Sequence, residues 1–405
     1  MTEGKSMTST KSARAAVTVD SQRWYDTLPA SSAFRVGDLV FISGQLSVDK
    51  EGEVRDPGDV TAQARNCFES LRDVVEQAGG TLDDIVEIQS FHTDLRRMDP
   101  VFDVAREFLT GGYPAWTAVG STGLPHPEAL VSIRAIAHLG DGPKETFTPD
   151  TLKWYRDLPA SAGCRKGDLL FVGGITPTDA DGNVINPGDH EAQARFCWNR
   201  VKEIAEWAGG SADDVVEITT FHQDARGMSG MVDAWWEDYG KNLASDETVA
   251  ITAIAVPGLH KFGALTAWRT IIDLSPGKRI GKTPASLWWK IVNISGATTK
   301  EGSTFVGLAG EVASDGDGNI TTPGDTAAQA RYAFARLVES LEMLGGSKEN
   351  IVELTSYHKD PRAWEIVQKE GLAFFGDHKP AWTPVGVTGL FKEGYVHEIH
   401  ALAVL

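Results

Sequence analysis

Hydrophobic positions near the start of the chain follow two different periods. Residues 39–43 form a continuous apolar run that Gly44 ends, which predicts a buried strand. Residues 64–78 place apolar side chains at helical spacing, between Asp59 as an N-cap and Gly79 as a stop. Further elements follow in the same way: strands over residues 85–93, 116–120 and 131–139, and a helix that opens at residue 99. The predicted order is ββαβαββ, an α+β unit with both helices on one face of its sheet.

This pattern occurs three times. The motif Pro-Gly-Asp, followed shortly by Gln-Ala-Arg, begins at residues 57, 187 and 323, a period of about 130 residues that is too long for a solenoid repeat. A block that reads Ile-Val-Glu-Ile-Gln-Ser-Phe-His from residue 85 recurs in close variants from residues 215 and 351. We therefore predict three domains, at residues 18–140, 148–274 and 284–405, with connectors at 140–150 and 275–286.

One face of each predicted sheet has no cover within its own unit. The helices shield only the other face, so the uncovered face must be buried elsewhere. Three such sheets in one chain can cover each other around a pseudo-threefold axis. We therefore expect a pseudo-trimer folded from one polypeptide, either monomeric or dimeric in solution.

The charge balance argues against several kinds of partner. The 405 residues carry a formal net charge of −18, which disfavours nucleic acid and anionic membranes, because both are bound mainly through Lys and Arg. Three cysteines without metal-type spacing indicate buried thiols in a reducing compartment. Residues 1–17 lack an apolar run and are interpreted as a loose tail, and no stretch is apolar enough to span a bilayer. We expect a cytoplasmic protein that acts on a small molecule.

Four segments of the first unit together resemble the RidA (YjgF) family. They are Leu-Val-Phe-Ile-Ser-Gly-Gln from residue 39, Ala-Gln-Ala-Arg from 62, Asp-Asp-Ile-Val-Glu from 83 and Ser-Ile-Arg-Ala-Ile-Ala from 132. The resemblance extends over nearly all of the three predicted domains. It implies a chorismate-mutase-like trimer with ligand clefts between neighbouring units. It also implies hydrolysis of small imines or enamines, such as 2-iminoacids, to carbonyl compounds and ammonia without a metal or cofactor.

The chain departs from this family where the resemblance places the substrate. The family's Pro-Ala-Arg motif, whose arginine holds a carboxylate, is replaced by triplets that end in Trp116, Ile251 and Trp382. An indole offers one N–H and a flat apolar face, so it cannot replace a bidentate guanidinium. We therefore expect a planar C–N compound other than a 2-iminoacid, stacked on Trp116 or Trp382. As buried sheet aromatics, these tryptophans would need no ligand.

The resemblance also assigns a water-activating glutamate, which maps onto Ser132, Ala267 and Glu398, so only the third unit keeps the acid. A desolvated carboxyl group can deliver water to carbon and a proton to nitrogen. His400 lies two residues further on and could share that proton. The family's small polar residue on the second strand is a hydroxyl only at Ser43. We predict one surviving site that combines Glu398 with Ser43, near the junction of the third and first units; the alternative for Glu398 is a solvated acid at a strand end.

A histidine recurs in all three units, as His92, His222 and His358, each at the start of a His-x-Asp-x-Arg run. Three interpretations remain: a general acid or base beside the cleft, a hydrogen-bonded core histidine, and an axial metal site. Strand alternation places His92 on the same face as Ile88, which favours the core interpretation.

Two arginines share the register of the mapped acid. Arg134 and Arg269, with His400 at the equivalent place, could receive an anionic substrate from the opposite wall of a cleft. Ion pairing with strand glutamates is an equal alternative. The recurring strand glutamates, for which a salt-bridged structural role is favoured, are Glu87, Glu217 and Glu353.

These patterns predict a metal-free hydrolase or deaminase of the Rid type, acting on a small imine, enamine or related C–N compound. No GxGxxG, Walker or GxSxG motif is present, so we expect no cofactor. The alternative is a small-molecule-binding or chaperone-like pseudoenzyme that lost catalysis together with the arginine. An endoribonuclease activity, known in the wider family, fits poorly with the net charge of −18.

Overall fold

Each third of the chain forms one six-stranded mixed sheet. The computed structural model describes residues 14–244 and 246–405, and its first sheet has the strand order β1-β2-β3-β6-β4-β5. The other two sheets repeat this order, as β7-β8-β9-β12-β10-β11 and β13-β14-β15-β18-β16-β17. In each sheet the final pair, such as β4 and β5, is parallel and the others are antiparallel. We call the units built on these sheets repeats 1, 2 and 3.

The strands of repeat 1 are β1 (Arg14–Val17), β2 (Ala33–Val36), β3 (Leu39–Gln45), β4 (Ile85–His92), β5 (Ala115–Gly120) and β6 (Val131–His138). Those of repeat 2 are β7 (Glu145–Phe147), β8 (Gly163–Lys166), β9 (Leu169–Ile175), β10 (Val215–His222), β11 (Ala250–Ala255) and β12 (Thr266–Asp273). Those of repeat 3 are β13 (Arg279–Lys282), β14 (Ala297–Lys300), β15 (Phe305–Glu311), β16 (Ile351–His358), β17 (Ala381–Gly386) and β18 (His397–Val404). The helices are α1 (Val60–Gln77), α2 (Met98–Phe108), α3 (His190–Trp207), α4 (Met228–Asp238), α5 (Thr326–Glu342) and α6 (Trp364–Phe375).

The first strand of each sheet lies in a segment that the sequence pattern does not predict as a strand. β1 falls within the expected tail, and β7 and β13 fall within the two expected connectors. The prediction of a loose tail is therefore wrong for residues 14–17, which pair with β2, while residues 1–13 lie outside the described residues. These short edge strands are held by backbone pairing and carry no clear apolar alternation, so pattern alone misses them.

The helix boundaries follow the predicted caps. The Asp59 carboxylate accepts hydrogen bonds from the backbone N–H groups of Thr61 and Ala62, each at 3.0 Å. Asp189 and Asp325 begin α3 and α5 in the same way. After α1 the backbone turns left-handed at Gly79, with φ of 93°, a conformation that glycine adopts without a steric penalty. Within the described residues, no helix is both long and apolar enough to cross a membrane.

The recurrent Gln-Ala-Arg motif fixes each first helix to its surroundings. In repeat 1, the Gln63 side chain accepts from Leu130 N at 2.8 Å and donates to Glu128 O at 3.0 Å, which ties α1 to the loop before β6. Arg65 forms two hydrogen bonds of 2.7 Å with Glu107 on α2. Equivalent contacts recur in the other repeats, so the motif is explained by structure.

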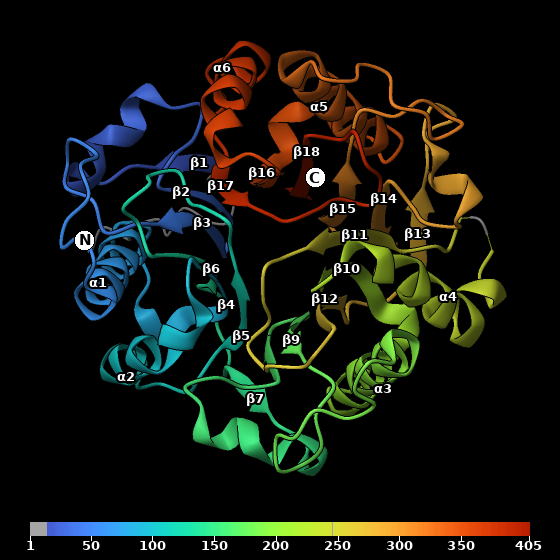
Figure 1. Cartoon of the computed structure of the whole chain (residues 1–405), viewed down its shortest axis with the longest axis horizontal. Coiled ribbons are helices and arrows are strands. Elements are labelled where there is room, and N and C mark those ends of the chain that lie inside the picture. Colours follow the sequence, from blue (N-terminus) through green and yellow to red (C-terminus); the bar gives the residue numbers. More distant parts are fainter. Residues whose placement is uncertain (1–13, 245) are drawn as a thin grey trace, which may run out of the picture.

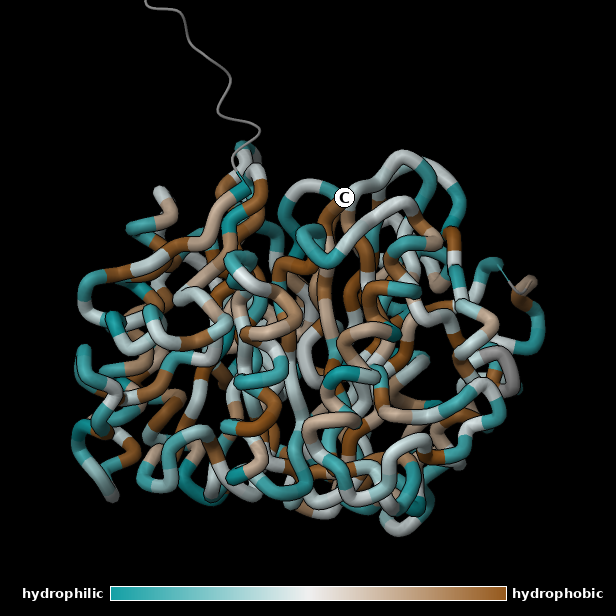
Figure 2. The backbone as a smooth tube through the Cα atoms, turned by 90° about the horizontal axis from the view of Figure 1, so that it is seen from above, coloured by the Kyte–Doolittle hydropathy of each residue, from teal (hydrophilic) through white to brown (hydrophobic). Residues whose placement is uncertain are grey.

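The three sheets surround a common axis, with the helices on the outside (Figure 1). Hydrophobic stretches run through the strands inside the molecule, and hydrophilic ones gather in the outer loops (Figure 2). Three backbone hydrogen bonds link neighbouring repeats in a cycle: Ser161 N to Pro114 O, Ser295 N to Val249 O, and Ser31 N to Pro380 O. This arrangement fits an intramolecular trimer. We call the boundaries between repeats 1 and 2, 2 and 3, and 3 and 1 the first, second and third seams.

Buried charged residues lie on this axis, between two apolar layers contributed by all three repeats. Arg269 binds Glu87 at 2.5 and 3.0 Å and Glu217 at 2.5 Å, and Arg134 binds Glu87 at 3.0 Å. Arg134 also pairs with Glu353. The arginines join different repeats, so the ion pairs connect all three sheets. We call Glu87, Glu217, Glu353, Arg134, Arg269 and His400 the axial ring.

The axial ring is incomplete in repeat 3, where His400 replaces an arginine. Its Nε2 lies 3.3 Å from Glu217 Oε1. Burial alone would raise the pKa of Glu87, but Arg269 and Arg134 outweigh burial and hold that pKa below its usual value. Burial raises the pKa of Glu353, whose Oε2 atom has no hydrogen-bond partner among the described residues. The missing guanidinium therefore leaves one carboxyl group of the ring poorly compensated.

Replacement of Arg269 by Met tests the contribution of the axial ring. The substitution leaves Glu87 and Glu217 buried without their shared partner, so the free energy of unfolding should fall by about 3–5 kcal/mol. The matched control is Arg226→Met, which removes an exposed arginine paired with Asp224 and should lower the free energy of unfolding far less than Arg269→Met. Denaturant titration measures both. Equal losses in the two variants would show that the ring adds nothing beyond a surface ion pair.

Candidate functional site

A small pocket at the second seam contains the acid that the sequence singles out. Repeat 2 contributes Met231, Val232, Ile251 and Ala253, and repeat 3 contributes Trp288, Trp289, Val292, Ile294, Phe391 and Glu398. The cavity volume is about 20 Å³, enough for one water molecule. Glu398 is the one ionisable group among the described lining residues. The pocket is therefore an apolar, aromatic enclosure around a single carboxyl group.

Burial raises the pKa of Glu398 from its ordinary value of 4.5 to about 8. A second buried acid, Glu311, lies nearby and accepts a hydrogen bond from Trp289 Nε1 at 3.1 Å. The pKa of Glu311 is also raised, first by burial and further by the charge of Glu398. Both carboxyl groups therefore favour their protonated forms near neutral pH, and either can act as a proton donor.

Local strand geometry places the two acids. The register between β15 and β18 shifts between Leu308 and Glu311, which marks a β-bulge. Gly310 lies in this bulge, and its backbone N–H donates to Thr252 Oγ1 of repeat 2 at 2.8 Å. A side chain at Gly310 would collide with Glu398 Oε1, so the glycine allows the carboxyl group to approach the backbone.

Ser43 does not share this pocket, which corrects the predicted combination with Glu398. Ser43 lies at the third seam, where its hydroxyl donates to Ser31 O at 2.6 Å and accepts from Trp382 N at 2.8 Å. Glu398 faces repeat 2 across the second seam. The hydroxyl group is thus committed to backbone contacts that join repeats 3 and 1.

Arg134, Arg269 and His400 belong to the axial ring rather than to a cleft. Each arginine is 1% exposed and bound to strand glutamates. Their guanidinium groups are therefore not free to receive an anionic substrate, and the ion-pair alternative describes them. His400 lies near Glu217 and does not line the pocket that contains Glu398.

The recurring histidines sit at strand ends on the helix-covered face. Trp116 Nε1 donates to Ser90 Oγ at 2.8 Å, and Ser90 Oγ lies 2.7 Å from His92 Nε2. In repeat 3, His358 Nε2 lies 2.8 Å from Ser356 Oγ, which accepts from Trp382 Nε1 at 2.9 Å. These contacts describe hydrogen-bonded core histidines. Neither histidine lines the pocket that contains Glu398.

The two candidate stacking tryptophans are packed within the protein. Trp116 contacts Phe68 and Phe102 edge to face, with ring centroids 6.2 and 5.3 Å away. Trp382 packs in the same way on Phe334, and it also lines a cavity of about 20 Å³ at the third seam. Neither indole has a free face large enough for a planar ligand in this conformation, and a role in binding stays a prediction.

Sequence reasoning missed most of the pocket around Glu398. Trp288, Trp289 and Phe391 supply its aromatic walls, and Glu311 supplies the second acid. Glu311 occupies a position where the other repeats have Gln45 and Ile175. Comparison of the three copies could have revealed this acid, because a charged residue there occurs only beside Glu398.

Candidate metal ligands do not cluster in this protein. Across residues 14–244 and 246–405, no group of three or more His, Cys, Asp or Glu side chains could hold a metal ion. The three cysteines are buried and unpaired by disulfides.

The protein is built from three similar α+β units around an axis, with small cavities where the units meet. Comparisons with known proteins identify the family that has this architecture. The model of the family described as Endoribonuclease L-PSP matches residues 23–139, 158–265 and 296–405. The chain therefore belongs to this family, which includes RidA and YjgF proteins, as a fusion of three copies.

Solved structures are similar to single repeats or to the whole arrangement. RidA from the Antarctic bacterium Psychrobacter sp. is 34% identical over 31% of this chain and 99% of its own, with a TM-score of 0.28. A YjgF-family protein from Mycobacterium tuberculosis is 28% identical over 31% and 99%, with a TM-score of 0.28. A chorismatase is 12% identical over 80% of this chain and 93% of its own, with a TM-score of 0.50, which supports the fold alone.

The raised pKa of Glu398 predicts a pH-dependent stability. Between pH 4.5 and 8 the folded protein keeps a proton that the unfolded chain releases, so this contribution is full below pH 4.5 and is lost as the pH rises toward 8. Glu398→Gln cannot ionise and should become more stable than the natural protein as the pH rises, by on the order of 1.4 kcal/mol per unit of pKa shift. Thermal or denaturant unfolding across this pH range provides the measurement. Glu393→Gln, at an exposed position, is the control; the same pH trend in both variants would contradict the assignment.

Proposed function

We propose that the protein is a metal-free, Rid-type hydrolase that converts a small imine or enamine to a carbonyl compound and ammonia at the second seam. The observation that carries this proposal is the protonated, buried carboxyl group of Glu398 beside a cavity the size of one water molecule. Imine hydrolysis requires a proton donor for nitrogen and a nearby water for carbon. Membership of the family supports a small-molecule function of this general kind.

In the proposed reaction the protonated Glu398 donates its proton to the imine nitrogen. The resulting carboxylate then accepts a proton from water as the water oxygen bonds to the imine carbon, which gives a carbinolamine. A second proton transfer from Glu398 to nitrogen turns the amino group into a leaving group; the C–N bond breaks to release ammonia, and the Glu398 carboxylate takes the hydroxyl proton as the carbonyl group forms. One water is consumed, and the carboxyl group ends in its starting protonation state. Glu311 accepts the hydrogen bond from Trp289 Nε1 and so holds one aromatic wall of the pocket.

The walls of the pocket narrow the class of substrate. No described lining residue is basic, and Ile251 stands where the family resemblance expects a carboxylate-binding arginine. A carboxylate substrate would be buried here without a cationic partner, which is costly. The aromatic side chains of Trp288, Trp289 and Phe391 instead suit a planar neutral imine or its protonated, cationic form.

Substrate entry requires a change in the pocket, because about 20 Å³ holds water but no organic molecule. The short helix η8 (Trp288–Ile291) provides both tryptophans, and Phe391 contacts Trp288 with ring centroids 5.4 Å apart. We place the entrance here, since outward movement of this aromatic wall opens the cavity without disturbing the axial ring.

The direct test is ammonia release from a panel of imines, enamines and cyclic amides, including members without a carboxylate. Glu398→Gln should lower kcat on any turned-over member by at least about 100-fold, because it removes the group that donates the proton. Glu393→Gln, an exposed glutamate in the loop before β18, should leave kcat unchanged.

Undiminished turnover by Glu398→Gln would remove Glu398 from the reaction. Saturable binding of panel members with no ammonia released from any of them would instead favour the alternative function, a binding or chaperone-like pseudoenzyme. The natural protein and both variants should have the same far-ultraviolet circular dichroism, which separates a catalytic effect from unfolding.

A further inference from the structure

The axial ring makes one contact across each seam, and the three contacts are not equivalent. At the first and third seams the contact is an arginine–glutamate pair; these pairs are Arg269 with Glu87 and Arg134 with Glu353. At the second seam it is made by an imidazole, since His400 Nε2 lies 3.3 Å from Glu217 Oε1. A guanidinium group is always charged, whereas an imidazole is charged only when it binds a second proton. Among the described ring contacts, the one at the second seam therefore depends on a proton.

The charges of the axial ring do not balance while His400 is neutral. Three carboxylates then face two guanidinium groups, and three negative charges against two positive ones leave a net charge of −1. Each side chain of the ring is at most 3% exposed. A buried charge without compensation is costly, so one bound proton stabilises the ring by making it neutral.

The surroundings of Glu217 favour the proton on His400. Burial would raise the pKa of Glu217, but Arg269 and His400 outweigh burial and hold that pKa below its usual value. The hydroxyl group of Thr219 also donates to Glu217 Oε1 at 2.6 Å, which favours the carboxylate. The other charged or titratable groups near this pair are the remaining ring members and Tyr357, whose pKa is raised by burial, so that its hydroxyl stays neutral.

Along the second seam, the pair of His400 and Glu217 lies between a permanent ion pair and the pocket that contains Glu398. Asp214, which directly precedes β10, binds Lys300 of repeat 3 at 2.5 Å. Glu217 follows within β10, and the part of β11 that lines the pocket pairs with the residues of β10 after Glu217. The lysine therefore anchors one end of the seam, and the imidazole holds the part beside the pocket.

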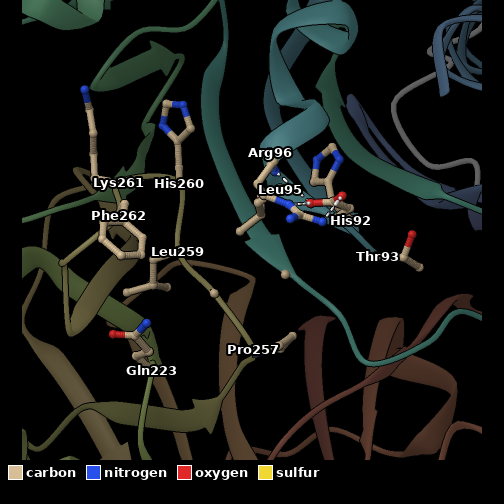
Figure 3. Close-up of a pocket in the computed structure, with 13 residues that line it drawn as sticks. His92, Thr93, Leu95, Arg96, Gln223, Pro257, Leu259, His260, Lys261 and Phe262 are labelled. Atoms are coloured by element: carbon tan, nitrogen blue, oxygen red, sulfur yellow. Dashed lines mark hydrogen bonds and ion pairs between the residues drawn. The ribbon is translucent and has the colours of Figure 1, made fainter.

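The cavities at the three seams differ as well. A cavity of about 380 Å³ lies at the first seam, and Figure 3 shows His92 and Arg96 on one side of it and His260, Lys261 and Phe262 on the other. The cavity at the third seam has a volume of about 20 Å³ and no carboxyl group among its described lining residues. The second seam combines a cavity of about 20 Å³ with a buried acid. The titratable ring contact thus occurs at the seam whose closed pocket contains the candidate catalytic group.

We propose that a proton held between His400 and Glu217 is a latch across the second seam. With the proton bound, the imidazolium–carboxylate pair holds repeats 2 and 3 together and keeps the aromatic pocket closed. As the pH rises, the proton passes to water and the ring acquires its net charge of −1. The seam then loosens beside Glu398, while Lys300 and Asp214 stay paired. The latch is a property of the fold, whereas its control of substrate access rests on the function proposed above.

Amide hydrogen exchange, resolved by residue with NMR, reports the latch without a substrate. The Gly310 N–H group donates to Thr252 Oγ1 across the second seam at 2.8 Å, and the Gly44 N–H group donates to Thr383 Oγ1 across the third seam at 2.9 Å. The ratio of their exchange rates cancels the direct effect of pH on exchange. Every protein compared carries Glu398→Gln, so that acid does not titrate. From pH 6 to 9 the ratio of Gly310 to Gly44 should rise about tenfold or more, because the loss of one proton changes an opening equilibrium by up to about tenfold per pH unit.

Two substitutions balance the ring by opposite routes, and each should abolish this rise. His400→Arg adds a permanent positive charge and Glu217→Gln removes a negative one, so neither ring needs a proton. The matched control is His126→Arg, which changes a half-buried histidine outside the ring and should retain the rise. Glu311, next to Gly310, is unchanged in all of these proteins, so its titration does not distinguish them.

The latch is overturned if the ratio does not rise in the parent protein, if it rises as much in either balanced variant, or if His126→Arg also abolishes it. Glu217→Gln keeps the volume of the side chain and carries the test if the larger arginine prevents folding. These outcomes do not depend on turnover. The hydrolase proposal is tested by ammonia release and the latch by amide exchange, so either can fail while the other holds.

Discussion

Buried ion pairs between carboxylates and guanidinium groups on the axis hold the three sheets against one another. Charges this deeply buried are tolerated only when each one has partners. Here the partners come from different repeats, as when Arg134 reaches Glu353 and Arg269 reaches Glu87. If one sheet separated from its neighbours, one member of an ion pair would be exposed to solvent and the other would stay buried without a partner. The ring therefore fixes the positions of the three sheets, and with them the width of each seam.

Because the axial ring holds all three sheets together, the side chains at the three seams can differ. Repeats joined in one chain are free to diverge, whereas identical subunits would change all three seams at once. The second seam encloses Glu398 and Glu311 in an aromatic pocket, the first seam has an open cavity rich in donors, and the third is narrowed around Trp382. The axial ring shows the same divergence, since His400 takes the place of an arginine. Glu398 lies two residues before His400 in β18. The place where the axial ring lacks an arginine is therefore next to the pocket that contains Glu398.

Local signals in the sequence predict the elements of each repeat well. Apolar periodicity, N-cap aspartates such as Asp59 and stop glycines such as Gly79 mark the helices because these effects act within a few residues. The polar edge strands, including β1, carry no such local signal because backbone pairing with a neighbouring strand holds them. The recurrence of Gln63 is visible in the sequence, but its contact with the Leu130 backbone is a tertiary contact.

The site is less predictable because its walls come from different repeats. Glu398 is recognisable from its equivalents in the other copies, yet the sequence does not state which repeat faces it, and the predicted pairing with Ser43 fails for that reason. The alternatives for Arg134 likewise depend on which carboxylates lie across the axis. The role of Glu311 requires the spatial arrangement, since Glu398 lies far away along the chain.

At the second seam, the buried carboxyl group of Glu398 is expected to stay protonated near neutral pH. Infrared difference spectroscopy of the natural protein against Glu398→Gln at pH 7 tests it most directly, because protonated and ionised carboxyl groups absorb at different frequencies. We expect a protonated-carboxyl band that is lost in Glu398→Gln and that disappears from the natural protein as the pH rises above about 8. A carboxylate band from Glu398 at pH 7 would contradict it.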